Sequence, residues 1–254
     1  FSDTINTGIY VLDPRVFEAM RPYFTEWYGN PSSHIHDQGQ AAQKAIEVAR
    51  GKVAALINAS PAEIVFTSGT TMSLNLVAHG WGRKFLRPGD EVLVNAMEHH
   101  ANLIPWQELA KRTGSKLRWI EVGEEGRFNL SQIDSLINEK TRILAITNQS
   151  NVLGTINPIK EIAKKAHEVG ALVVLDACQS VPHFSIDVKE LDVDFLAYSG
   201  HKMLGPTGTG VLYGKKQILE RMDMFLVGGE TVVDSTYDGY KQEELPMRFE
   251  AGLQ

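Results

Sequence analysis

The chain has 254 residues, 43% of them hydrophobic and 22% charged, a composition typical of a globular protein. Its formal net charge of −6 argues against nucleic-acid binding, which normally requires clustered Lys and Arg. No apolar run approaches the roughly 20 residues that a membrane-spanning helix needs, and Phe1 to Thr4 do not resemble a signal peptide. The single cysteine, Cys178, excludes an intrachain disulfide and fits a reducing compartment, so we expect a cytoplasmic protein.

Helical and extended patterns alternate along the chain. A first helix is predicted to begin at Asp13 and Pro14, and to break at Pro22 before it ends near Tyr28. Apolar residues at helical spacing predict further helices over 38–57, 71–81, 130–138 and 159–169. Short β-branched runs predict strands over 63–67, 91–95, 116–122, 142–148, 172–176, 195–199 and 210–213.

The alternation of strands and helices is typical of βαβ units, so the sequence predicts an α/β fold with a largely parallel, buried sheet. No internal repeat, low-complexity tract or linker divides the chain. From about Phe225 the pattern gives way to Gly-, Asp- and Glu-rich sequence, which predicts no closing element. The chain therefore looks cut, and residues 1–254 are expected to form one large domain with 1–30 as an N-terminal segment.

A polar cluster directly follows each of five predicted strands. These clusters are Thr67 to Thr71, Met97 to His100, Asn148 to Asn151, Asp176 to Gln179 and Ser199 to Lys202. In open α/β sheets, ligands bind beyond the carboxyl ends of the strands. The sequence therefore predicts a binding site at this edge of the sheet.

Two of these clusters have the chemistry to hold a charged ligand. Thr70 and Thr71 begin a predicted helix, where free N–H groups and the helix dipole favour an anion. An ordinary N-cap is the commoner explanation of such residues, and it stays open from the sequence alone. Asp176 ends a wholly apolar strand, where a desolvated carboxylate needs a partner such as a protonated ring nitrogen. A cap or a surface turn is the alternative for Asp176.

Three further side chains are candidates for chemistry. Lys202 follows a strand and precedes a Gly-rich loop, a place where its amine could form a Schiff base, although most lysines are solvated surface residues. His99 could stack on a planar cofactor and carry protons, or could be a structural histidine. Cys178 is expected to fill space rather than to act as a nucleophile, because no basic partner is evident.

Two other interpretations of the polar residues have little support. His34 and His36 have the spacing of a strand, and no Cys or Glu ligands cluster beside them, so no metal site is expected. A nucleotide-binding domain would need a P-loop or a Gly-x-Gly-x-x-Gly sequence after the first strand. The sequence contains neither.

Five stretches together resemble the cysteine desulfurases of the class V aminotransferase group. They are EIVFTSGTT (63–71), MEHHANLIPW (97–106), SNVLGTINP (150–158), DACQS (176–180) and YSGHKMLGP (198–206). The forms MEHH and SNVLG are similar to the group II branch, whereas YGNPSS (28–33) is similar to group I. The resemblance implies pyridoxal 5′-phosphate (PLP) as cofactor and the fold-type I large domain, a three-layer α/β/α structure with a mostly parallel seven-stranded sheet.

The resemblance also implies a role for each matching residue. Lys202 matches the lysine that carries PLP as a Schiff base and moves the substrate's α-proton. Asp176 matches the partner of the pyridine nitrogen, and His99 matches the residue stacked on the ring. The phosphate-binding residues of the family are matched by Thr70, Thr71, Ser199 and His201. Gln179 matches the hydrogen bond to the phenolic oxygen, and Asn151 matches the residue near the phenolic oxygen and the substrate carboxylate.

The chain departs from the family pattern in three places. The N-terminal Asp-Asn-Ala-Ala-Thr pattern is replaced by the segment from Asp3 to Thr7, which puts the substrate fit in question. Leu253 stands where the family has a threonine that reaches the phosphate in the neighbouring subunit. The family's sulfur-accepting cysteine and substrate-carboxylate arginine belong to a C-terminal domain that is missing from these 254 residues.

In the full-length family, the resemblance implies conversion of L-cysteine to alanine and persulfide sulfur by a homodimer. It also implies a sulfur-acceptor protein and a place in iron-sulfur cluster assembly. The present chain is expected to bind PLP without efficient desulfuration, because no nucleophile is evident in it. The alternatives are another class V aminotransferase, a selenocysteine lyase, or a non-catalytic remnant that binds PLP.

Overall fold

The computed structural model describes residues 13–33 and 35–252. Seven strands form one sheet in the order β1-β7-β6-β5-β4-β2-β3, in which β7 runs antiparallel to both of its neighbours and the other pairs are parallel. The strands are β1 (Ile64–Thr67), β2 (Glu91–Asn95), β3 (Lys116–Ile120), β4 (Thr141–Thr147), β5 (Leu172–Asp176), β6 (Phe195–Ser199) and β7 (Gly210–Gly214). The predicted α/β fold with a mostly parallel seven-stranded sheet is confirmed.

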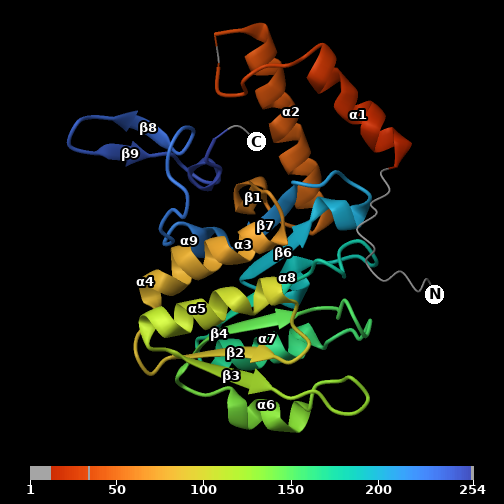
Figure 1. Cartoon of the computed structure of the whole chain (residues 1–254), viewed down its shortest axis with the longest axis vertical. Helices are drawn as coiled ribbons and strands as arrows, with labels where there is room; N and C mark the ends of the chain where they lie inside the picture. The colour runs from red at the N-terminus through yellow and green to blue at the C-terminus, as the bar shows by residue number, and fades with distance from the viewer. Residues whose placement is uncertain (1–12, 34, 253–254) are drawn as a thin grey trace.

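Helices cover both faces of this sheet, so that the fold has three layers (Figure 1). One hydrophobic cluster joins the sheet to α3 (Thr70–Val77) and α5 (Ile104–Thr113). The cluster on the other face joins the sheet to α6 (Leu130–Leu136), α7 (Ile159–Glu168) and the end of α2 (Asp37–Leu56). Because side chains alternate between the faces of a strand, the sheet supplies residues to both clusters.

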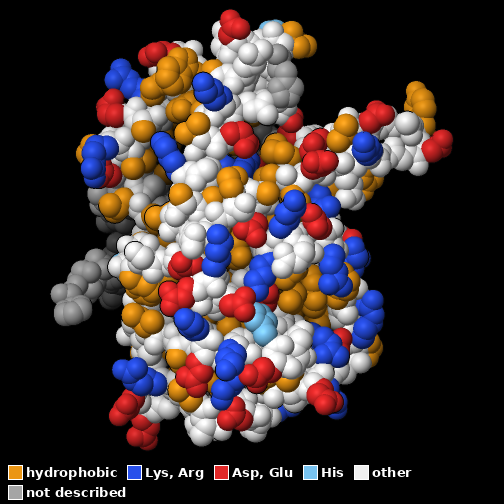
Figure 2. Space-filling model, turned by 180° about the vertical axis from the view of Figure 1, so that it is seen from behind, with side chains coloured by type: hydrophobic (Ala, Val, Ile, Leu, Met, Phe, Trp, Pro, Cys, Tyr) orange, Lys and Arg blue, Asp and Glu red, His pale blue; other side chains and the backbone are white. Residues whose placement is uncertain are grey.

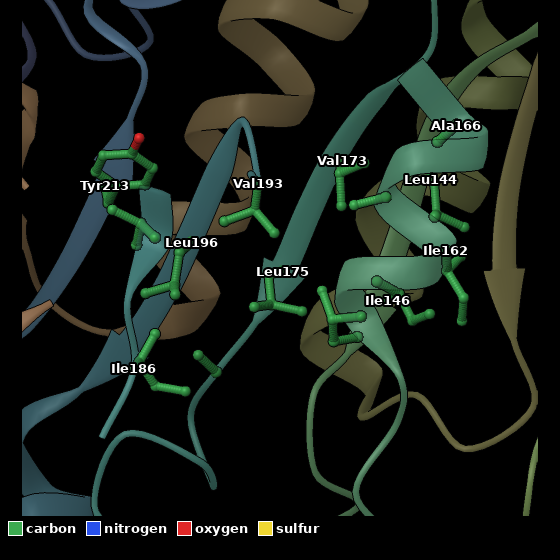
Figure 3. Packing of buried hydrophobic residues seen from close by; sticks show 14 of the residues in the cluster. Leu144, Ile146, Ile162, Ala166, Val173, Leu175, Ile186, Val193, Leu196 and Tyr213 are labelled. Carbon is green, nitrogen blue, oxygen red and sulfur yellow. The ribbon is translucent and has the colours of Figure 1, made fainter. Parts of the chain in front are cut away.

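The central strands are apolar on both faces, which explains their uninterrupted hydrophobic sequences. In β5, Val173 and Leu175 pack towards α7, whereas Val174 packs into the opposite cluster. Figure 3 shows Ile162 and Ala166 of α7 beside strand residues of this core. All of these side chains are fully buried, and each contributes about 1 to 3 kcal/mol according to its size.

The other elements are short or lie outside the sheet. They are α1 (Pro14–Thr25), α4 (Arg83–Phe85), α8 (Val188–Leu191), α9 (Lys216–Leu219) and a hairpin of β8 (Val232–Ser235) and β9 (Tyr240–Gln242). The hairpin projects from the body of the protein in both whole-chain views, and Figure 2 shows acidic and basic side chains intermixed over the face seen there. None of the helices in the described part of the chain is both long and apolar enough to cross a membrane.

Three predictions about the elements are wrong. Pro22 lies inside α1 and does not break it. A proline removes one helical hydrogen bond and so leaves one backbone carbonyl without its partner. Because α1 buries none of its residues, water can bind that carbonyl instead. The sequence after Phe225 is not featureless, since it forms the exposed β8–β9 hairpin and a turn with Phe249 buried. Helix α3 ends at Val77, before a π-helical turn over Ala78–Gly82.

Candidate active site

The ends of non-adjacent segments meet at the carboxyl edge of the sheet. Thr147 of β4 is paired with Asp176 of β5, so these two strands end together. Strand β7 runs in the opposite direction, and its first residue, Gly210, is therefore paired with the last residues of β1 and β6, Thr67 and Ser199. Four of the predicted polar clusters thus begin at one edge.

The loop before α3 is fixed tightly against this edge. The Thr70 N–H donates to the Ser199 hydroxyl oxygen at 2.8 Å, and the two hydroxyl groups lie 2.8 Å apart. Gly69 has a φ of 146°, which favours glycine, and a Cβ on Gly210 would overlap the Gly69 backbone. Thr71, the next residue of the helix, is exposed. The result is a helix N-terminus with hydroxyl groups beside it, which can bind an anion.

Asp176 is a buried carboxyl group without a cationic partner among the described residues. Its side chain is 4% exposed and accepts a hydrogen bond of 2.9 Å from the Cys178 N–H. Burial raises the pKa of Asp176 to about 6, although the Cys178 N–H opposes this shift. A cation placed against this carboxyl group would favour its ionised form. The protonated nitrogen of a pyridine ring therefore fits here.

A second carboxyl group, Glu98, is partly buried and lies close to Asp176. Burial, with the charge of Asp176, raises the pKa of Glu98 well above its usual range. Its oxygens accept hydrogen bonds from the side chains of Asn95 and Asn102 and from the Thr147 N–H. The sequence placed Glu98 in a polar cluster, but we assigned it no role. Its burial depends on the meeting of β2 and β4, which no local pattern reveals.

His99 directly follows Glu98, and a hydrogen bond defines the orientation of its ring. The Ala101 N–H donates to His99 Nδ1 at 3.1 Å, so that this nitrogen carries no proton. Burial, the neighbouring His100 and the charge of Lys202 lower the pKa of His99. A neutral imidazole is therefore presented at the sheet edge, where it can stack on a flat ligand.

Lys202 lies in a 3₁₀ turn, Gly200–Met203, that directly follows β6. The turn is fixed by hydrogen bonds from the Gly200 N–H to the Thr209 carbonyl and from the Gly205 N–H to the Gly200 carbonyl. Lys202 is half-buried, and its charge lowers the pKa of both His99 and His201, after the larger effect of burial on each. Among the described residues the Lys202 amine has no hydrogen bond or ion pair, so it is available to a ligand.

Two of the predicted site residues are not hydrogen-bonded to the others. Gln179 is half-buried and Asn151 is exposed, and neither side chain has a hydrogen bond to another described site residue. The segment from Asp3 to Thr7 and the position of Leu253 lie outside the described residues. Nowhere in 13–33 and 35–252 do three or more His, Cys, Asp or Glu side chains form a group that could hold a metal ion.

Cys178 packs beneath the anion-binding loop. Burial and the charge of Asp176 raise the pKa of the Cys178 thiol, while hydrogen bonds with Thr70 and Ser199 oppose this shift. A thiol held in its protonated form is a weak nucleophile. Beside this region a cavity of about 460 Å³ is lined by Thr71, His99, His100, Arg83 and Arg112, among others.

Comparison with known proteins identifies the family of the chain. The aminotransferase class-V family matches residues 10–253. A cysteine desulfurase of Haloferax volcanii is 45% identical over 240 residues, which are 94% of this chain and 56% of that protein. A probable cysteine desulfurase of Halalkalibacterium halodurans is 47% identical over 243 residues, which are 93% of this chain and 59% of that protein.

Among solved structures, the apo cysteine desulfurase of Thermococcus onnurineus has a TM-score of 0.93 and 42% identity, over 98% of this chain and 62% of that one. Fold and site define the class as an α/β protein with a lysine, a buried aspartate and a helix N-terminus at one sheet edge. The chain belongs to the aminotransferase class-V family. It spans less than two thirds of the length of the curated relatives named above.

Proposed function

We propose that residues 1–254 form the PLP-binding large domain of a cysteine desulfurase. One observation carries this proposal: Lys202, the buried Asp176 and the α3 N-terminus at Thr70 lie at the same edge of one sheet. The three groups match an aldehyde, a ring nitrogen and a phosphate, which are the three recognition features of PLP. The names of the relatives support cysteine as the amino acid acted on.

The residues of the site fit the cofactor in chemical type. Thr70, Thr71, Ser199 and His201 would hold the phosphate group, with the helix N-terminus supplying N–H donors. The carboxylate of Asp176 would keep the ring nitrogen protonated, and Gln179 and Asn151 would bind the phenolic oxygen. When bound, PLP supplies an electron sink for the electrons of a broken C–H bond.

The side chains of this chain would have separate roles in the transfer of the α-proton. With PLP bound, the Lys202 amine would be the base that removes the α-proton of L-cysteine. His99, whose lowered pKa keeps the imidazole neutral, would cover one face of the ring and exclude water from it. These two residues, with Asp176, account for substrate activation by the chain.

Sulfur transfer needs a thiolate that these residues do not supply. Cys178 is the single cysteine of the sequence, and burial keeps its thiol protonated. We therefore expect α-proton exchange without efficient desulfuration. In the whole protein, a cysteine outside these residues would receive the sulfur and pass it to an acceptor protein for iron-sulfur cluster assembly. We further propose a homodimer in the cytoplasm.

Exchange of the α-proton tests this proposal. Protein with PLP is incubated in D₂O with L-alanine, which has no thiol to react with free cofactor, and deuterium at the α-carbon is followed by NMR. We expect exchange with the parent and with the exposed-lysine control Lys189→Ala, and background exchange with Lys202→Ala. Equal exchange by parent and Lys202→Ala would show that the lysine has no such role.

A further inference from the structure

The carboxyl group of Glu98 joins three segments of the chain. Oxygen Oε1 accepts from the Asn95 side chain at the end of β2 and, at 2.6 Å, from the Thr147 N–H at the end of β4. Oxygen Oε2 accepts from the Asn102 side chain at 2.8 Å. All three partners are donors, so the site is built around two carboxyl oxygens.

These contacts reach into the core on one side. The Asn102 side chain is fully buried, and its oxygen accepts from Trp106 Nε1 at 3.0 Å. Trp106 is itself fully buried under the sheet in the cluster with α3 and α5. The segment that carries His99 is therefore connected through Glu98 and Asn102 to a rigid part of the molecule.

On the other side, the contacts reach the cofactor-binding edge. In the described chain, the Thr147 N–H gives the one hydrogen bond that joins residues 96–102 to β4. Thr147 is paired with Asp176 on β5, so the same bond relates the His99 segment to the carboxyl group proposed for the ring nitrogen. Two residues that must contact one flat ring, His99 and Asp176, are thereby set at a fixed separation.

We propose that Glu98 is a positioning residue, which clamps the segment 96–102 to the ends of β2 and β4 and so holds the His99 imidazole against the cofactor ring. This inference rests on the proposed function, since it assumes that His99 stacks on PLP. Glu98 acts through His99 and does not itself touch the ring. The charge of Asp176, which contributes to the raised pKa of Glu98, supports the closeness of the two carboxyl groups.

A double-mutant cycle tests the coupling of Glu98 to His99. We expect Glu98→Ala and His99→Ala each to weaken PLP binding about tenfold, because both variants lose the stacking of the His99 ring on the cofactor. The double variant should bind no more than about twofold more weakly than His99→Ala alone, because the clamp acts through that ring. Visible circular dichroism of the bound cofactor, which reports a fixed asymmetric environment, should fall in Glu98→Ala. If the two losses of PLP affinity multiply in the double variant, the residues act independently and the proposal is overturned.

Glu91, on the strand that precedes Glu98, provides a matched control. It is a buried glutamate at the opposite end of β2, with hydrogen bonds from Arg118 at 3.2 Å and Asn138 at 2.9 Å. Glu91→Ala should lower the unfolding midpoint without changing the PLP dissociation constant or the visible circular dichroism. If Glu91→Ala weakens PLP as strongly as Glu98→Ala does, the effect is general destabilisation and the proposal is wrong.

Amide hydrogen exchange in the cofactor-free protein separates this proposal from the proposed function. Exchange at Thr147 and Ala101 should accelerate about tenfold in Glu98→Ala and stay unchanged in Glu91→Ala. Unchanged exchange in both variants would disprove the clamp, whether or not the parent binds PLP. If Glu98→Ala does not fold, Glu98→Gln keeps the shape and places a donor against Asn102, and about threefold weaker PLP binding is expected. An unaltered dissociation constant in Glu98→Gln would then contradict the proposal.

Discussion

The N–H of Thr70 donates a hydrogen bond of 2.8 Å to the hydroxyl oxygen of Ser199, which lies 129 positions later in the chain. This bond places the N-terminus of α3 beside the turn that carries Lys202, although the two are separated by five of the seven strands in sequence. The two are close enough for one small ligand to contact both. In the proposed function, this pairing brings the groups for the phosphate and the aldehyde of PLP together.

Replacing Ser199 with alanine removes both contacts to Thr70. We expect Ser199→Ala to weaken PLP binding about tenfold, since the loop loses its anchor and the phosphate loses a hydroxyl group. Titration of the visible spectrum measures this change. Ser115→Ala is the control, because Ser115 is buried and bonded to Thr113 just before β3, at the far edge of the sheet. Equal affinities of Ser199→Ala and the parent would show that the hydroxyl group plays no part in binding.

The buried ion pair of Arg50 and Glu250 should be a major source of stability. The two side chains are 1% and 3% exposed, and Glu250 also accepts from the Phe66 N–H at 2.7 Å. Glu250→Ala leaves the buried guanidinium with only the longer contact to the exposed Glu47, at 3.4 Å, so we expect a loss of about 3–5 kcal/mol in the free energy of unfolding. Urea denaturation measures this loss.

The exposed pair Lys160 and Glu190 supplies the comparison for that experiment. Glu190→Ala should cost less than about 1 kcal/mol, because water screens the interaction. If Glu250→Ala were as mild as Glu190→Ala, the Arg50–Glu250 contact would not form in solution.

Asp176 should lower the stability of the cofactor-free protein as the pH rises. Its folded-state pKa of about 6 lies above the ordinary 3.8, so the folded chain holds a proton that the unfolded chain releases between these values. Stability is therefore lost as the pH rises through this window. Asp176→Asn removes the loss, and we expect it to exceed the parent by about 1–3 kcal/mol at pH 7.5 and by less at pH 4.5.

Urea unfolding at the two pH values measures the difference, with the exposed Asp238→Asn as control. Removal of the Asp176 charge also eases ionisation of Glu98, which adds to the effect in the same direction. A difference between parent and Asp176→Asn that is independent of pH would contradict the assigned burial of this carboxyl group.

The thiol of Cys178 should react slowly in the folded protein. Burial and the charge of Asp176 keep it protonated, so alkylation by iodoacetamide at pH 8 is expected to be at least about tenfold slower than in urea-unfolded protein. Mass spectrometry of the labelled chain follows the reaction. Labelling at the same rate in both states would mean that the thiol is accessible and ionised, as a sulfur acceptor needs to be.

The sequence predicted those parts of the structure that have a local signal. The apolar runs of β2, β5 and β6 defined these strands to the residue, because strands buried on both faces read as uninterrupted hydrophobic segments. Helix α5 was missed, although Pro105 in its first turn and the left-handed Gly114 after its end are usual helix boundaries. The β8–β9 hairpin was missed because its side chains are mostly exposed and show no alternation.

The sequence predicted those residues of the candidate site that directly follow a strand. Asp176, Ser199 and Lys202 follow apolar strands directly, and parallel strands end at one edge. The hydrogen-bonded carboxyl group of Glu98 and the buried charge of Glu250 were not predicted, since their partners come from other strands and from a helix 200 residues away. Long-range pairing of this kind depends on strand order, which the sequence pattern did not define.

The absorption spectrum of protein mixed with PLP tests the central claim most directly. Parent, Lys202→Ala and the exposed-lysine control Lys189→Ala are each mixed with cofactor, dialysed and compared in the visible range. We predict a yellow band that survives dialysis in the parent and in Lys189→Ala, and its absence from Lys202→Ala. A band of equal strength in Lys202→Ala, or a parent that becomes colourless on dialysis, would contradict the assignment of Lys202 as the cofactor-binding residue.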